Sequence, residues 1–280
     1  MNGNEPPESD EADEIMVPSP QGAAMRAMVL CTVVGRAYLE LYGPGKSIFQ
    51  FLSRRAAEKE RSMMREAIEI SELEEELEPD ERELLETPFG RADKSALVRA
   101  AWRAEGLALL AWALQRYEIP PYDQRVPEDD IIAQGGRLTV GSWFAFLMDE
   151  NKKAPWESAE LRPESEIGKY ASHITIVNWR LTTFRMSPEQ TKEAGINPKR
   201  MDFVGFLRAH PSFKETWLDG LRIIGGDLAI GDKAIGDAPE EEVYRCMSIA
   251  VERQIAAYWL QGDNEVYSKV VPATILMGLP

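Results

Sequence analysis

The sequence predicts a mainly α-helical fold, a bundle-like arrangement of several helices with one small β-hairpin near residues 227–236. Two segments, at about 20–42 and 94–117, are apolar almost all round, which is typical of helices buried inside a bundle. Between residues 167 and 184, apolar side chains recur at intervals of three and four, the period of a helix that packs on a neighbour. A further long helix is predicted at 239–261, with acidic residues at its start and a glycine just after its end.

The chain is predicted to have an acidic tail followed by one helical domain. Residues 1–18 are acidic and proline-rich with almost no apolar anchor, so we expect them to be disordered. Ser19 and Pro20 have the pattern of an N-cap followed by proline at the first helical position. Residues 19–280 are expected to form a single α-helical domain, with any seam between two lobes in the irregular segment 118–163.

The first helix carries one polar stripe, formed by Thr32, Arg36 and Glu40 at a spacing of four residues. The glycines and proline at 43–45 are predicted to end it. A Gly-Lys-Ser sequence at 45–47 is superficially similar to a phosphate-binding loop. That loop requires a glycine where Glu40 stands and a strand before it, so we interpret this segment as a helix-ending turn.

The segment that follows is predicted to form charged surface helices. Residues 48–78 fit one or two such helices, because their apolar edge is narrow. A short helix is predicted from Pro79 until Thr87, where the next residue is proline. Asp93 is then expected to cap the apolar helix at 94–117.

The last third of the sequence predicts short elements before the final long helix. Cap-plus-proline pairs at Ser187 and Asn197 predict two short helices. Two short apolar arms around the Gly-Asp pair at 231–232 predict the hairpin. The final helix is expected to open after Asp237 and to close at Gly262.

Composition favours a cytoplasmic protein. The 280 residues have a net charge of −15, which would repel phosphates, so no nucleic-acid binding is predicted. The two cysteines, Cys31 and Cys246, lie in apolar helical stretches and favour a reducing compartment. The N-terminus lacks the pattern of a signal peptide. The best apolar run near it, at 27–35, is too short to span a bilayer, so no membrane contact is predicted.

The sequence predicts no catalytic residues, no metal site and no cofactor. His173 and His210 are the only histidines, and no paired Cys/His spacing of a zinc site is present. Asp227, Asp232 and Asp237 lie five residues apart, which does not match the alternating ligands of a calcium loop. We therefore expect these aspartates to serve turns and caps. His173 is expected to be packed or solvent-facing rather than a general base.

Charged residues inside the apolar helices are the candidate functional residues. Arg103 and Glu105 project from nearly opposite sides of their helix, so they cannot pair with each other. Each needs a partner on another element, because a buried unpaired charge is costly. The candidates are Trp102, Arg103, Glu105, Trp112, Glu252, Arg253, Gln254 and Arg36. Two hypotheses remain open: an ion-pair network that fixes the register of the helices, or a polar pocket floored by one of the tryptophans.

Residues 102–114, with the sequence Trp-Arg-Ala-Glu-Gly-Leu and then a leucine-rich run ending in Trp-Ala-Leu, resemble the central motif of a bacterial family, domain of unknown function 4272. Residues 78–86 are similar to its upstream acidic helix, and residues 251–260 to its late Glu-Arg motif with Trp-Leu. The resemblance covers about residues 22–271, with a departure in the stretch 186–225, which we do not match to the family. It implies an α-helical domain and no particular activity. It also places four candidates within the family's motifs: Arg103, Glu105, Glu252 and Arg253.

We expect a non-enzymatic module that binds another protein, as an adaptor or an immunity-like partner. This follows from the missing catalytic constellation and from the acidity, since acidic surfaces attract basic partners. The alternative is an enzyme or small-molecule-binding protein with a polar pocket between the 94–117 helix and the last long helix. An anion site at a proline-started helix end has only generic support. The sequence does not specify the oligomeric state.

Overall fold

The computed structural model of the chain describes residues 17–42, 50–127, 159–195, 197–211 and 213–272. Over these residues the protein is mainly helical with a small antiparallel sheet, which confirms the predicted fold class. Most of the acidic tail, the predicted turn at 43–45, the Gly-Lys-Ser sequence and most of the predicted seam lie outside the described residues.

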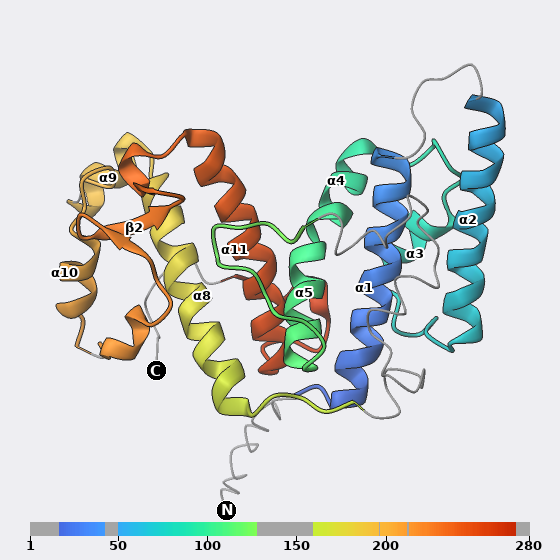
Figure 1. Cartoon of the computed structure of the whole chain (residues 1–280), viewed down its shortest axis with the longest axis horizontal. Coiled ribbons are helices and arrows are strands. Elements are labelled where there is room, and N and C mark those ends of the chain that lie inside the picture. The colour runs from blue at the N-terminus through green and yellow to red at the C-terminus, as the bar shows by residue number, and fades with distance from the viewer. Residues whose placement is uncertain (1–16, 43–49, 128–158, 196, 212, 273–280) are drawn as a thin grey trace, which may run out of the picture.

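Figure 1 shows α2, α1, α5, α11 and α8 side by side in that order, with the small sheet, α9 and α10 at the end beside α8. In chain order the elements are α1 (Pro20–Leu41), α2 (Gln50–Ile70), α3 (Pro79–Glu86), α4 (Lys94–Trp102), α5 (Ala104–Ala113), α8 (Glu164–Phe184), α9 (Pro188–Ala194), α10 (Phe203–Arg208), η1 (Glu215–Leu218), β1 (Ile223–Ile224), β2 (Asp227–Ile230), β3 (Lys233–Ala234), η2 (Ile235–Asp237), α11 (Glu240–Leu260) and η3 (Tyr267–Lys269). The helices α1, α5, α11 and α8 therefore enclose the core, with the helix α2 at one end and the small sheet, α9 and α10 at the other.

Helix α1 begins and ends where the sequence predicts, and it is buried almost all round. The Ser19 hydroxyl accepts a hydrogen bond from the Gly22 amide at 3.0 Å, as an N-cap does. By length and composition α1 could cross a membrane, yet 89% of its most apolar window is buried inside the protein. Contacts with α2, α3, α4 and α5 account for this burial.

The predicted single helix at 94–117 is two helices, which corrects the sequence interpretation. Arg103 lies in a tight turn between α4 and α5, where its amide reaches the carbonyls of both Arg99 and Ala101. Helix α5 also ends early, because Gln115 adopts a left-handed φ of 61°. The Arg116 amide then donates to the Ala111 carbonyl at 2.8 Å, the long bond of a Schellman motif. The sequence does not predict this helix end, because a glycine usually occupies the left-handed position and here Gln115 does.

The second of the two predicted proline-started helices begins later than expected. Helix α9 starts as predicted, with Ser187 as its N-cap. Asn197 instead caps a turn, and α10 begins at Phe203 with Asp202 as its N-cap. The Asp202 carboxylate accepts from the Gly205 amide at 2.9 Å, so a cap without proline starts this helix.

The hairpin predicted around residues 231–232 is confirmed as the pair β2–β3, and β1 adds a third antiparallel strand. Strand β2 is buried throughout. Arg180 of α8 forms two hydrogen bonds of 2.6 Å to the Asp227 carboxylate at the start of β2. This buried bidentate pair joins the sheet to the helical core.

Candidate functional site

Glu105 and Arg253 form a buried ion pair between α5 and α11. Glu105 Oε2 accepts from Nε of Arg253 at 3.0 Å and from its Nη2 at 2.8 Å. Both side chains are almost completely inaccessible to solvent. The last helix thus supplies the partner that Glu105 requires, and this enclosure favours the ion-pair hypothesis for these two residues.

The same pair holds the loop that follows α5. Arg253 donates to the carbonyl oxygens of Pro120 at 2.7 Å and Gln124 at 3.0 Å. The second oxygen of Glu105 accepts from the Val126 amide at 2.9 Å. Glu105 on α5 and Arg253 on α11 therefore hold the loop at 120–126 in place, and this loop has no helix or strand of its own.

Arg103 faces the opposite side and binds α3. Its guanidinium pairs with Asp80 at 2.9 Å and also with the buried Glu81, which Arg26 of α1 contacts as well. The other oxygen of Glu81 accepts from the Glu78 amide at 3.0 Å, within a capping box. These contacts fix the short helix α3 against the junction of α4 and α5.

The remaining polar candidates lie apart from these pairs. Arg36 is fully buried, pairs with Glu40 at 2.5 Å and donates to the Thr87 carbonyl at 3.3 Å. Gln254 donates to the Thr175 hydroxyl of α8 at 3.0 Å and accepts from Asn178 at 2.7 Å. Arg36 therefore connects α1 to the end of α3, whereas Gln254 connects α11 to α8.

The two candidate tryptophans are in different surroundings. The Arg125 guanidinium lies 5.1 Å from the ring centroid of Trp102. The Arg162 guanidinium lies 4.8 Å from Trp112, whose ring centroid is 5.0 Å from that of Tyr170. Trp112 also lines a hollow of the structure.

Glu252 is the candidate with the most perturbed acidity. The pKa of this carboxyl is raised to about 7, mainly by burial and to a smaller extent by the negative charge of Glu105, against the opposing positive charge of Arg103. The neighbouring hydroxyl of Tyr267 also has a raised pKa, because it is buried and faces the Glu252 charge. Glu252 therefore titrates near neutral pH, unlike an exposed glutamate.

We expect Glu252→Gln to stabilise the protein at pH 8 but not at pH 5. The folded pKa lies above the unfolded value of 4.5, so the wild type loses stability as pH rises from about 4.5 to 7. The loss should be on the order of 1–2 kcal/mol, since the side chain is partly accessible. Urea unfolding at both pH values measures it, with the exposed Glu193→Gln as control. A difference between Glu252→Gln and wild type that stays constant with pH would contradict this titration.

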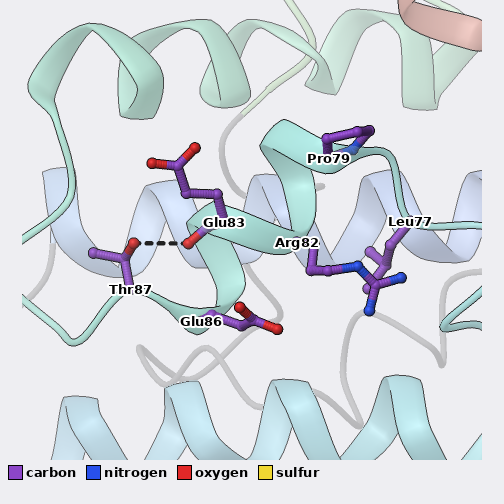
Figure 2. A pocket seen from close by; sticks show the side chains of 6 residues that line it. All are labelled: Leu77, Pro79, Arg82, Glu83, Glu86 and Thr87. Atoms are coloured by element: carbon purple, nitrogen blue, oxygen red, sulfur yellow. Dashed lines mark hydrogen bonds between the residues drawn. The ribbon is translucent and has the colours of Figure 1, made fainter.

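One hollow of the surface, a groove of about 480 Å³, runs along α3 and the segment before it (Figure 2). Its lining residues are Leu77, Pro79, Arg82, Glu83, Glu86 and Thr87. The Thr87 hydroxyl donates to the Glu83 carbonyl at 2.7 Å and closes the end of the helix. Figure 2 shows the side chains of Arg82 and Glu86 on the α2 side of α3, and Glu83 on the other side.

The groove lies in the most acidic part of the described chain. Residues 66–86 contain eleven acidic residues and one basic residue, Arg82. Of the eleven, only Glu78 and Glu81 are buried. Ile70, at the end of α2, is 74% exposed within this surface. This acidic groove therefore lies among residues that carry −10 of the net charge of −15, and its own lining places Leu77 and Pro79 beside Glu83, Glu86 and Arg82.

A second hollow, of about 340 Å³, lies where α5 ends beside α8. The residues around this aromatic pocket are Trp112, Ile119, Pro120, Pro121, Tyr122, Glu166, Lys169, Tyr170, His173, Asp219 and Gly220. The loop held by Arg253 and Glu105 forms one wall. Sequence reasoning found Trp112 but did not find Tyr122 or Asp219, because loop residues show no periodic pattern.

The described residues contain no group of three or more His, Cys, Asp or Glu that could hold a metal ion. Cys31 and Cys246 are buried free thiols, as their apolar surroundings predict. Burial raises the pKa of Cys246 to about 11, so this thiol stays protonated at neutral pH.

The protein is thus mainly α-helical, and its buried polar groups include ion pairs and hydrogen-bonded neutral side chains. Residues 3–201 match the model of the family described as domain of unknown function (DUF4272), and the chain belongs to this family. The late motif at 251–260 lies beyond the matched residues. No curated protein and no solved structure matches the chain.

Proposed function

We propose that this protein is a non-enzymatic module that binds a basic protein segment along the acidic groove of α3. The observation that carries the proposal is the density of exposed carboxylates in residues 66–86 around a surface hollow. Glu83 and Glu86 line the groove together with the apolar Leu77 and Pro79. Such a lining complements an amphipathic segment with basic and apolar side chains.

Electrostatics supports a protein partner more than a small anion or a nucleic acid. Many like charges held on one surface repel one another, and a basic partner relieves this repulsion. The field of these carboxylates also steers a cationic partner and repels phosphates. Binding along the groove is therefore expected to weaken as salt concentration rises.

The double variant Glu83→Lys/Glu86→Lys should weaken binding of a basic amphipathic peptide about tenfold or more at low salt. The probe is a fluorescein-labelled helical peptide of lysine and leucine, measured by fluorescence anisotropy at 50 and 300 mM salt. Lysine suits the C-terminal half of α3, so the variant should keep its fold. Thermal unfolding checks this.

A matched control separates the groove from the overall charge of the protein. Glu193→Lys/Asp232→Lys changes the net charge equally at exposed positions on α9 and in the hairpin turn. This control should bind the peptide within about twofold of wild type if long-range charge is mostly screened. Equal weakening in both variants, or unchanged binding in the groove variant, would overturn the proposal.

A further inference from the structure

Four aromatic rings follow one another in the aromatic pocket. Ring centroids are 5.0 Å apart for Trp112 and Tyr170, 6.1 Å for Tyr170 and His173, and 6.2 Å for His173 and Tyr122. Ile119 and the prolines of the loop add apolar surface. A volume of 340 Å³ is near the lower end of the range of small-molecule sites, about 300–1,000 Å³. The pocket therefore suits a small flat molecule.

The polar ends of the tyrosines are tied to the protein interior. The Tyr122 hydroxyl donates to the Ala229 carbonyl of β2 at 2.6 Å. The Tyr170 hydroxyl interacts with the buried Arg253, which also holds the loop wall. Both rings are thus fixed in position before any ligand enters. A preformed aromatic wall loses little conformational entropy on binding.

His173 offers one hydrogen-bond acceptor in a defined tautomer. Its Nδ1 lies 3.1 Å from the carbonyl oxygen of Asp219, and a carbonyl only accepts, so Nδ1 carries the hydrogen. Burial lowers the pKa of His173, the hydrogen bond to the Asp219 carbonyl opposes this, and the positive charges of Arg253 and Lys169 add to the lowering. At neutral pH the ring is therefore uncharged, and Nε2 keeps its lone pair.

The charged residues of the pocket disfavour an anionic ligand. Lys169 pairs with Asp219 at 2.9 Å, and both side chains are largely exposed. Glu166 adds a second carboxylate to the lining. Glu166 is itself paired with Arg162 at 3.3 Å, and the Arg162 guanidinium lies over the Trp112 ring. Both cations at the pocket are therefore already paired with carboxylates, so neither is free to bind a phosphate or carboxylate on the ligand.

From these observations we propose that the aromatic pocket binds an uncharged, planar fused-ring heteroaromatic molecule that donates an N–H group to His173. The aromatic faces supply stacking, which is tolerant of ring identity. The acceptor on His173 selects for a ligand with an N–H donor, and the paired cations Lys169 and Arg162 offer no free charge to an anion. This site is separate from the acidic groove and does not depend on the function proposed for it.

The test uses three ring compounds that differ in one group each. Indole has the N–H donor, 1-methylindole lacks it, and indole-3-acetate adds a negative charge. By calorimetric titration at pH 7.5, we expect the full chain to bind indole about fivefold more tightly than 1-methylindole. Indole-3-acetate should bind more weakly than indole by a similar factor. No binding of indole at millimolar concentration, or equal binding of all three compounds, would overturn the proposal.

Two variants assign the roles of the lining residues. His173→Phe keeps a ring but removes the acceptor, so indole and 1-methylindole should bind it equally. Trp112→Leu should weaken both compounds about tenfold, because a stacking face is lost. The groove variant Glu83→Lys/Glu86→Lys should bind indole as wild type does, which keeps failure of this proposal distinct from failure of the proposed function.

A measurement on the wild type covers the case in which His173→Phe does not fold. Long-range ¹H–¹⁵N spectra report which ring nitrogen of His173 carries the hydrogen. Nε2 should resonate as an unprotonated nitrogen and shift on addition of indole but not of 1-methylindole. A protonated Nε2 at pH 7.5, or the same shift with both compounds, would refute the donor–acceptor assignment.

Discussion

Replacing Arg253 by leucine is expected to lower the free energy of unfolding by about 3–5 kcal/mol. The substitution leaves Glu105 as an unpaired carboxylate in the core between α5 and α11. It also removes the donors to the carbonyls of Pro120 and Gln124, so the loop loses two of its anchors. Both effects are large because the side chains involved are shielded from water.

Urea-induced unfolding of Arg253→Leu measures this loss of stability. The loss on breaking an exposed ion pair, Lys169–Asp219, serves as the comparison. Lys169→Leu breaks the exposed pair with Asp219 and should cost less than about 1 kcal/mol. Glu105→Met combined with Arg253→Leu should recover only part of the loss, because the loop carbonyls remain without donors. A cost below 1 kcal/mol for Arg253→Leu would show that the pair does not hold the core.

The loop depends on this ion pair, and the aromatic pocket depends on the loop. Pro120 accepts a hydrogen bond from Arg253 and also lines the pocket. The sequence places Glu105 and Arg253 on apolar helices and requires partners for them. It does not indicate that the partner of Glu105 lies 148 residues away, since periodicity gives a helix face and not its neighbour.

Helix boundaries were predictable where local chemistry marks them. Ser19, Ser187 and the proline at 79 start helices as their sequence patterns predict. The turn at Arg103 was not predictable, because a continuous apolar run has no breaker residue there. At this turn the Arg103 side chain is bound to Asp80 and Glu81 of α3, and the segment itself does not encode these contacts.

The candidate site was predictable only in part, for a similar reason. Trp112 stood out as an aromatic residue in a very apolar helix, and it lines the aromatic pocket. Tyr170 belonged to the apolar stripe of its helix, so its position at the pocket had no separate pattern. Asp219, whose carbonyl orients His173, lies in a loop after η1, where only the tertiary fold brings the two together.

Alanine at position 106 is expected to destabilise the protein by about 2–3 kcal/mol, although alanine is intrinsically better in a helix by about 1 kcal/mol. A Cβ built on Gly106 would lie 2.2 Å from Oη of Tyr267 and 3.4 Å from the backbone oxygen of Glu252. Tyr267 is buried against Trp259 and beneath Arg26, so its ring has little room to move. The glycine therefore sets the approach of α5 to α11 and η3.

Tyr267→Phe in the same background tests this explanation, because it removes the atom that alanine would meet. Among the described residues, the buried Tyr267 hydroxyl has no hydrogen-bond partner, so its removal alone should cost less than about 0.5 kcal/mol. The double variant Gly106→Ala/Tyr267→Phe should then return to within about 1 kcal/mol of wild type, a coupling of about 2 kcal/mol by urea unfolding. If the double variant is as unstable as Gly106→Ala, the destabilisation comes from the helix backbone. Close packing at Gly106 would then not be the reason for glycine in the Trp-Arg-Ala-Glu-Gly sequence.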